Sequence, residues 1–301
     1  MNERMAEEPT ERAEDQVAED QVAEEVRHAD SPALEEPQPP VDPTFEQASS
    51  GSTPDWLLAG ASVRGTSHIA SGTPCQDAHT IRACQTSGEE GVLIAVVSDG
   101  AGSARHAEYG SRAACDFIST RVEHLLCSSG LSLEDLNPDS LISEARAHLE
   151  ALADAMECEP RDLACTLLCA VVFPQAALFF QVGDGALIYG DEDLDVAAWP
   201  SGGEYANQTD FVYAARPEQV HTRRISGTVR KLAMVSDGLQ MVCLRLQEQR
   251  VHPAFFARFF QALEASSDRE LFEGALARTL NNERINASTD DDKTLVLALR
   301  A

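Results

Sequence analysis

Short apolar runs and longer amphipathic stretches follow one another along the chain, and the two patterns predict different elements. Six runs of apolar and β-branched residues have the length of single strands, and we expect strands at 56–63, 92–98, 166–173, 177–182, 229–236 and 294–299. Apolar residues recur at three- and four-residue spacing between Ala107 and Leu126, which predicts an amphipathic helix. Residues 141–156, 254–264 and 270–280 predict further helices. Clustered strands followed by paired helices indicate an α+β fold, a sheet core covered by helices.

The first 53 residues differ from this pattern. They hold 15 acidic and 3 basic side chains, one aromatic residue and six of the fourteen prolines. Such a segment buries too little apolar surface to offset the entropy lost on ordering. We therefore expect a disordered acidic tail over 1–53 and one folded domain over 54–301.

The formal charge of the whole chain is −27, from 50 acidic and 23 Lys and Arg residues. This balance argues against a nucleic-acid partner, which needs dense clusters of Lys and Arg. The charged first 30 residues contain no apolar export segment, and no later run approaches the roughly 18 apolar residues of a membrane span. We expect a cytoplasmic protein whose eight scattered cysteines are free thiols, with no membrane partner.

The strongest motif is an apolar run that ends in Asp-Gly, which occurs at Asp99, Asp184 and Asp237. A fourth acidic cluster, residues 290–292, directly precedes the last apolar run. Asp-Gly is also a favoured hairpin turn, and this explanation is strong for Asp184, which lies between two apparent strands. Asp99 and Asp237 do not precede returning strands, so a turn does not explain the set.

Carboxylates at neighbouring strand ends of one sheet would converge, and unpaired carboxylates repel one another unless cations neutralise them. Oxygen-only ligand sets suit hard divalent ions such as Mg²⁺ or Mn²⁺. The sequence therefore predicts a site for two such metal ions.

Six ordered motifs resemble those of the metal-dependent protein phosphatases of type 2C, in particular a divergent, mainly bacterial branch. They cover the chain from about Trp56 to Arg300 and consist of 65–77, 99–102, 165–166, 183–185, 236–238 and 291–294. The resemblance implies a four-layer αββα sandwich, with a central antiparallel β-sandwich and a dinuclear Mg²⁺ or Mn²⁺ site at its edge.

By position in these motifs, the resemblance also implies metal ligands. Asp99 is similar to the carboxylate that bridges both ions, and the carbonyl of Gly100 to a further ligand. Asp237 and Asp291 resemble the remaining ligands of the first ion, and Asp77 the residue that holds metal-bound water.

Three more residues match supporting positions. Asp184 is similar to a residue linked to outer-shell water or to a weaker third metal ion, and Thr166 to a supporting hydroxyl. Gln76 stands where many members of the family have Glu, so an amide replaces a second-shell carboxylate.

The phosphate-binding Arg of the family falls on His68 here, so we assign substrate binding to His68, to Arg64, or to both. Ala101 follows Asp99-Gly100 where the family often has His or Met, so a general acid must come from elsewhere. His68 is the best candidate, since an ordinary histidine titrates near neutrality.

The resemblance implies a serine/threonine phosphatase that hydrolyses phosphoserine and phosphothreonine with a metal-activated water. Its partner would be a phosphorylated protein, for instance the substrate of a cognate kinase. Two alternatives stay open: a phosphatase-like binding module with little activity, and an enzyme for a small phosphorylated metabolite. A polar loop at 199–211 is expected to influence substrate choice.

A Cys-x5-Arg spacing from Cys115 to Arg121 matches the count seen in thiolate-based phosphatases. That chemistry needs a glycine-rich loop at a helix N-terminus to lower the thiol pKa. The residues between them continue the amphipathic helix instead, so we reject this assignment.

Overall fold

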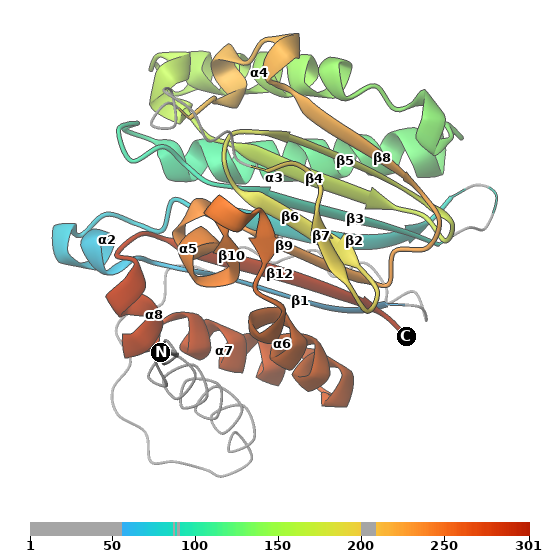
Figure 1. Cartoon of the computed structure of the whole chain (residues 1–301). Helices are drawn as coiled ribbons and strands as arrows, with labels where there is room; N and C mark the ends of the chain where they lie inside the picture. The colour runs from blue at the N-terminus through green and yellow to red at the C-terminus, as the bar shows by residue number, and fades with distance from the viewer. Residues whose placement is uncertain (1–55, 87, 89–90, 200–208) are drawn as a thin grey trace, which may run out of the picture.

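The computed structural model of the chain describes residues 56–301, apart from 87, 89–90 and 200–208. The expected acidic tail over 1–53 lies outside these residues, so its disorder stays a prediction. Two five-stranded antiparallel sheets form the centre of the described part (Figure 1). Because neighbouring strands are antiparallel, the end of one strand lies beside the start of the next.

Sheet I has the strand order β1-β12-β9-β6-β7 and contains β1 (Trp56–Val63), β12 (Lys293–Arg300), β9 (Lys231–Val235), β6 (Ala186–Gly190) and β7 (Leu194–Val196). Sheet II has the order β2-β3-β4-β5-β8 and contains β2 (Ala78–Gln85), β3 (Gly91–Ser98), β4 (Leu167–Val172), β5 (Ala176–Val182) and β8 (His221–Ser226). The short strands β10 (Leu244–Arg245) and β11 (Arg250–Val251) pair to form a separate two-stranded sheet.

Helices cover the outer face of each sheet (Figure 1). The helices α3 (Ala107–Glu123) and α4 (Pro138–Ala155) lie over sheet II, and α6 (Pro253–Ala265) and α7 (Arg269–Leu280) lie over sheet I. Shorter helices are α2 (Thr66–Ser71), α5 (Gln240–Cys243) and α8 (Glu283–Ser288). The layers therefore run αββα, and the predicted α+β sandwich is confirmed.

The strand β3 shows why the central strands are uniformly apolar. Val92, Ile94 and Val96 pack into the core under α3 and α4, whereas Leu93 and Ala95 pack between the two sheets. Successive side chains point to opposite faces of a strand, and both faces of β3 are buried. A continuous apolar run is the result, and this run made the strand predictable from sequence.

The predicted helices are confirmed with small shifts at their ends. The pattern from Ala107 to Leu126 forms α3, which continues into a π-helical turn at His124–Ser128. Asn137 caps α4 by accepting a hydrogen bond from the Ser140 amide at 3.1 Å, and Pro138 follows it at the first helical position. The Cys-x5-Arg stretch lies wholly within α3, as expected from its apolar spacing.

Six strands of the described residues lie outside the predicted ranges: β2, β6, β7, β8 and the two-residue strands β10 and β11. The strands β2, β7 and β8 lie at sheet edges, where one side of the strand meets solvent and polar residues are tolerated. The hairpin explanation of Asp184 is wrong, because β5 belongs to sheet II and β6 to sheet I. The Asp184 loop instead carries the chain from one sheet to the other.

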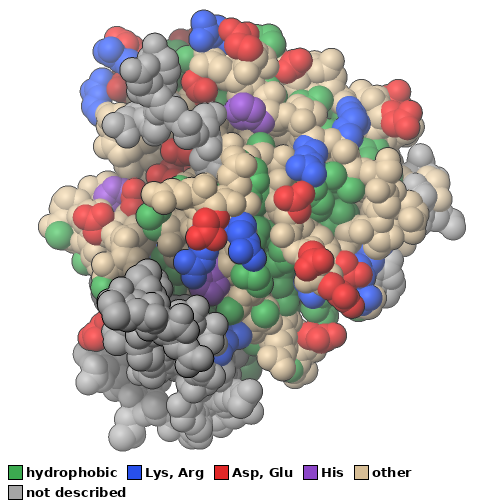
Figure 2. Space-filling model, in the orientation of Figure 1, with side chains coloured by type: hydrophobic (Ala, Val, Ile, Leu, Met, Phe, Trp, Pro, Cys, Tyr) green, Lys and Arg blue, Asp and Glu red, His purple; other side chains and the backbone are tan. Residues whose placement is uncertain are grey.

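On the face shown in Figure 2, Lys and Arg side chains are interspersed with Asp and Glu side chains. Among the described residues, no helix is both long and apolar enough to cross a membrane. All eight cysteines are free thiols, as the sequence predicted.

Candidate metal centre

The acidic residues singled out from sequence all lie just before or just after a strand. The strand registers show that these strand termini lie on the same side of the sandwich. Ala78 at the start of β2 pairs with Ser98 at the end of β3, which places Asp77 beside Asp99 on sheet II. Val235 at the end of β9 pairs with both Ala186 and Leu295 on sheet I. The carboxylates therefore come from both sheets, and not from one sheet as the sequence argument assumed.

Three of these carboxylates form a compact group. Oxygen atoms of Asp99, Asp184 and Asp237 all lie within 4.8 Å of one another. Asp77 and Asp291 approach the same group, and the charges of Asp77, Asp237 and Asp291 all act on Asp99. All five predicted acidic side chains thus gather at one edge of the sandwich.

Burial and repulsion by neighbouring acids raise the pKa values of Asp77, Asp99 and Asp237 in the absence of a cation. Burial raises the pKa of Asp77 to about 7, against the opposing hydrogen bonds from Ser236 and Thr294. Burial and then the charges of its acidic neighbours raise the pKa of Asp99 well above its ordinary value. The pKa of Asp237 rises to about 6, first through burial and then through the charges of Asp184 and Asp291. A divalent cation would relieve this cost.

Three buried side-chain oxygens of this site have no hydrogen-bond partner in the described ranges of the chain and are therefore available to a cation. Asp77 Oδ1, Asp184 Oδ1 and Gln76 Oε1 are buried and have no hydrogen-bond partner among the described residues. Buried polar atoms are otherwise almost always satisfied, and oxygens are the ligands that Mg²⁺ and Mn²⁺ prefer. The donor set therefore fits hard divalent cations.

Hydrogen bonds from across the sandwich hold the sheet II acids in place. Asp77 Oδ2 accepts from the hydroxyls of Ser236 at 2.7 Å and Thr294 at 2.8 Å. The amide of Asp99 donates to the Thr166 hydroxyl at 3.0 Å, and the Thr166 amide donates to the Asp99 carbonyl at 2.8 Å. Thr166 thus supports Asp99 through its backbone, a contact consistent with the supporting role expected from sequence.

Asp184 is held by two residues that the sequence did not single out. The Thr209 hydroxyl donates to Asp184 Oδ2 at 2.8 Å, and the Gln240 amide donates to the Asp184 carbonyl. Gly183 before it has φ +99°, a left-handed conformation that favours glycine. No local sequence pattern identifies Thr209 or Gln240, because both partners lie far along the chain.

Glycines in the Asp-Gly motifs allow close backbone approach. A Cβ atom on Gly238 would lie 2.1 Å from the Asp292 carbonyl oxygen, and one on Gly100 would lie 2.8 Å from the Gln76 carbonyl oxygen. Neither position leaves room for a side chain. In each sheet, the Asp-Gly motif therefore lets the loop after one strand contact the loop before the neighbouring strand, β9 with β12 in sheet I and β3 with β2 in sheet II.

Asp291 and Asp292 have different surroundings although they are adjacent. Asp291 is exposed, and the buried Lys293 donates to its carbonyl at 3.1 Å. Asp292 is buried, and its carboxylate accepts hydrogen bonds from the amides of Gly65 and Gln76, each at 2.6 Å. Asp291 is thus the member of the pair whose carboxylate lies open to the cluster.

The two candidate substrate-binding residues are placed differently. His68 lies on α2 with Nδ1 2.9 Å from Asp292 Oδ1, close to the peptide that precedes Asp77. Arg64 is exposed and donates a 3.4 Å hydrogen bond to the Thr73 carbonyl. The structure thus brings His68, but not the guanidinium of Arg64, against residues of the acidic edge.

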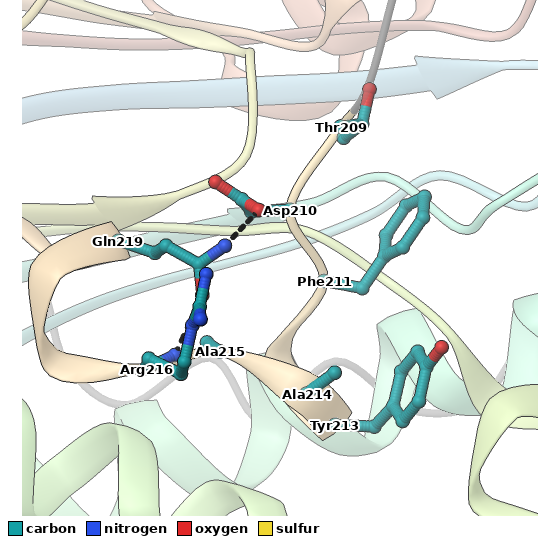
Figure 3. A pocket seen from close by; sticks show the side chains of 8 residues that line it. All are labelled: Thr209, Asp210, Phe211, Tyr213, Ala214, Ala215, Arg216 and Gln219. Atoms are coloured by element: carbon teal, nitrogen blue, oxygen red, sulfur yellow. Dashed lines mark hydrogen bonds between the residues drawn. The ribbon is translucent and has the colours of Figure 1, made fainter. Parts of the chain in front are cut away.

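A hollow of about 480 Å³ is lined by residues between Thr209 and Gln219 (Figure 3). The aromatic rings of Phe211 and Tyr213 lie on one side, and Arg216, Gln219 and Asp210 lie on the other, with Gln219 donating to Asp210. Thr209 lines the hollow and also binds Asp184. Most of the predicted loop at 199–211 falls on residues 200–208, outside the described residues.

The raised pKa values predict a pH dependence of stability for the metal-free chain. The folded chain keeps the Asp77 proton up to about pH 7, whereas the unfolded chain releases it near the ordinary value of 3.8. Between these values the folded state binds more protons, so the free energy of unfolding falls as the pH rises. We expect a loss of at least about 1 kcal/mol between pH 4.5 and pH 7.5, or roughly 3 °C in the unfolding midpoint.

Calorimetric unfolding with EDTA at both pH values measures this loss. Saturating Mn²⁺ at pH 7.5 should restore the midpoint, because a cation bound to the folded state alone stabilises it. A metal-free midpoint that is the same or higher at pH 7.5 would contradict the crowded, buried arrangement of these carboxylates.

Comparison with known proteins agrees with the geometry. The family model described as Protein phosphatase 2C matches residues 64–281. A curated relative, "Serine/threonine-protein phosphatase 3" of Escherichia coli (strain K12), is 33% identical over 250 residues, which cover 82% of this chain and 99% of the relative.

Solved structures share the fold at low sequence identity. The serine/threonine phosphatase Stp1 from Staphylococcus aureus has a TM-score of 0.54 at 15% identity, covering 88% of this chain and 99% of that one. The S. agalactiae serine/threonine phosphatase has a TM-score of 0.56 at 14% identity, covering 81% of this chain and 99% of that one. The resemblance drawn from six sequence motifs is confirmed, and the chain belongs to the protein phosphatase 2C family.

Proposed function

We propose that the chain is a Mg²⁺- or Mn²⁺-dependent phosphatase that hydrolyses phosphoserine and phosphothreonine in proteins. The observation that carries the proposal is the convergence of five carboxylates from two sheets. The pKa values of Asp77, Asp99 and Asp237 are raised, and within the described part of the chain Asp77 and Asp184 each keep an unpartnered buried oxygen. The E. coli relative carries a serine/threonine-phosphatase name, which supports the same activity.

Asp99 would bind both ions, with the Gly100 carbonyl as a further ligand, and Asp237 and Asp291 would complete the ligands of the first ion. Asp77 would hold metal-bound water. Asp184 would serve outer-shell water or a weaker third ion, and Gln76 would be an outer-shell amide. When bound, such ions activate water for in-line attack on phosphorus and neutralise charge on the phosphoryl oxygens.

The chain's own residues keep the acids in position for this chemistry. Ser236 and Thr294 fix one oxygen of Asp77 and leave the other facing the site. Thr166 fixes the backbone of Asp99, and Thr209 fixes one oxygen of Asp184. The ligands are thus pre-arranged before a substrate arrives, which lowers the cost of reaching the reactive geometry.

The substrate is proposed to be a phosphorylated polypeptide, supplied by a serine/threonine kinase. The hollow supports a polypeptide over a small metabolite. It offers aromatic side chains and the 69% exposed Arg216, and Thr209 in its lining binds Asp184 of the acidic cluster. A residue that flanks the phosphorylated one could bind there.

A hydrolysis assay on the full chain tests the proposed function. We expect release of phosphate from a phosphoserine peptide with Mn²⁺, and loss of this activity in EDTA. Turnover that persists in EDTA would exclude the metal-dependent reaction. Binding of Mn²⁺ without turnover on any phosphosubstrate would favour the binding-module alternative.

Replacing Tyr213 by Ala tests the role of the hollow. We expect KM for a phosphoserine peptide to rise roughly 10-fold through lost apolar contact, while the kinetics with an aryl phosphate stay unchanged. Tyr109→Ala is a matched control, since Tyr109 is 53% exposed and lies outside the hollow. Equal effects on both substrates, or on neither, would count against peptide binding at this place.

A further inference from the structure

The buried carboxylate of Asp292 joins three segments of the acidic edge. Its side chain is 2% exposed, and its Oδ1 atom accepts the Gly65 amide at 2.6 Å. Its Oδ2 atom accepts the Gln76 amide, also at 2.6 Å. Both oxygens are therefore engaged by backbone donors, unlike the unpartnered oxygens of Asp77 and Asp184.

The third contact of Asp292 is His68, whose side chain is 16% exposed. Nδ1 of His68 lies 2.9 Å from Oδ1, a close polar contact that is not aligned as a hydrogen bond. With Nδ1 facing inward, Nε2 on the opposite side of the ring is the atom left available to a ligand. The same carboxylate also accepts a hydrogen bond from the amide of Gln76, the residue before Asp77. Asp292 therefore links His68 to the segment that carries Asp77.

The helix α2 that carries His68 rests directly on the backbone of the Asp291 loop. The Ser67 amide and hydroxyl donate to the Asp290 carbonyl at 3.0 and 2.7 Å. A Cβ atom on Gly65 would lie 2.3 Å from the Asp291 carbonyl carbon, so only glycine fits there. The position of His68 is therefore tied to the loop that carries Asp291.

We propose that Asp292 is a positioning residue for phosphate binding, which fixes His68 beside the metal centre instead of binding metal itself. The proposal rests on the proposed phosphatase function, and it assigns different roles to two adjacent acids. Asn at 292 would place its NH₂ group either opposite the Gln76 amide or opposite the Gly65 amide and the imidazole, and both orientations remove the negative charge that faces His68. His68 would then be held less firmly while Asp291 keeps its place.

A double-mutant cycle tests this role in the Mn²⁺-loaded full chain with an aryl phosphate substrate. The aryl-oxide leaving group of this substrate needs little help from a general acid. We therefore expect Asp292→Asn and His68→Gln each to raise KM roughly 10-fold with kcat changed by less than about 3-fold. The double variant should be no worse than the poorer single variant, because both changes remove one shared interaction. Asp290→Asn is the matched control, since Asp290 is exposed and contacts Ser67 through its backbone carbonyl.

Three results would overturn the proposal. If the effects of the two variants multiply, or if Asp292→Asn leaves KM unchanged, Asp292 does not act through His68. If calorimetry shows that Asp292→Asn loses Mn²⁺ binding, Asp292 belongs to the metal ligands.

A second measurement needs neither a variant nor turnover. Long-range ¹⁵N spectra of the metal-free, wild-type chain report which ring nitrogen of neutral His68 carries the proton. We expect Nδ1 to carry it, because Asp292 faces this atom, and a proton on Nε2 would overturn the proposal. Absence of Mn²⁺-dependent hydrolysis in the wild type would instead refute the proposed function, and these spectra would still decide the His68 contact.

Discussion

Replacing Asp99 by Asn is expected to reduce Mn²⁺-dependent turnover by at least about 100-fold. Asp99 lies where the acids of the two sheets meet, and the charges of Asp77, Asp237 and Asp291 all act on it. Asn has nearly the same shape but carries no charge and offers only one acceptor oxygen. The substitution therefore removes a ligand while leaving the backbone contacts of Thr166 in place.

Steady-state hydrolysis of a phosphopeptide and calorimetric titration with Mn²⁺ measure the two parts of this effect. The Asp191→Asn variant is a control, because Asp191 is 57% exposed in the turn between β6 and β7. An Asp99→Asn chain with at least half of the wild-type turnover would show that Asp99 does not bind the catalytic metal.

Replacing Gly238 by Ala is expected to have the second-largest effect, on both stability and metal binding. The added Cβ would lie 2.1 Å from the Asp292 carbonyl oxygen, so the Asp237 and Asp292 loops must move apart. Overpacking of this kind costs about 1–3 kcal/mol, or roughly 3–10 °C in the unfolding midpoint of a domain this size. The displaced Asp237 should weaken Mn²⁺ binding at least about 10-fold.

Gly102→Ala gives a matched control for this prediction. Gly102 is exposed in the loop after Asp99, and an added Cβ there meets no atom within 4 Å. Thermal unfolding and Mn²⁺ titration of both variants separate close approach from a general intolerance of Ala in these loops. If both substitutions have the same effect, close backbone approach is not the reason for glycine at 238.

The strands that could be predicted from the sequence are mainly those with both faces buried. The strand β3 gives a continuous apolar run because it packs between α3 and sheet I. Edge strands such as β2 (AHTIRACQ) and β8 (HTRRIS) give no such signal, because solvent on one side permits His, Arg and Thr. The sheet change at Asp184 was equally hidden, since a local pattern cannot show which sheet the next strand joins.

Asp99, Asp184 and Asp237 were predictable because each follows an apolar run, and Asp77 and Asp291 because each lies within a motif of the family. Their supporting groups were harder to find. Ser236 and Thr294 stood within quoted motifs, and only the fold shows that both donate to Asp77, 159 and 217 residues away. The role of Asp292 depends on the direction of its side chain, and the Asp-Asp sequence alone does not distinguish it from Asp291.

Anomalous diffraction at the manganese edge, from crystals of the full chain grown with Mn²⁺, tests the account most directly. We expect two strong peaks at the shared sheet edge, with Asp99 between them, Asp237 and Asp291 at one peak and Asp77 near the other. Peaks elsewhere, or no peak at these carboxylates with Mn²⁺ in excess, would contradict the assignment of this edge as the metal centre.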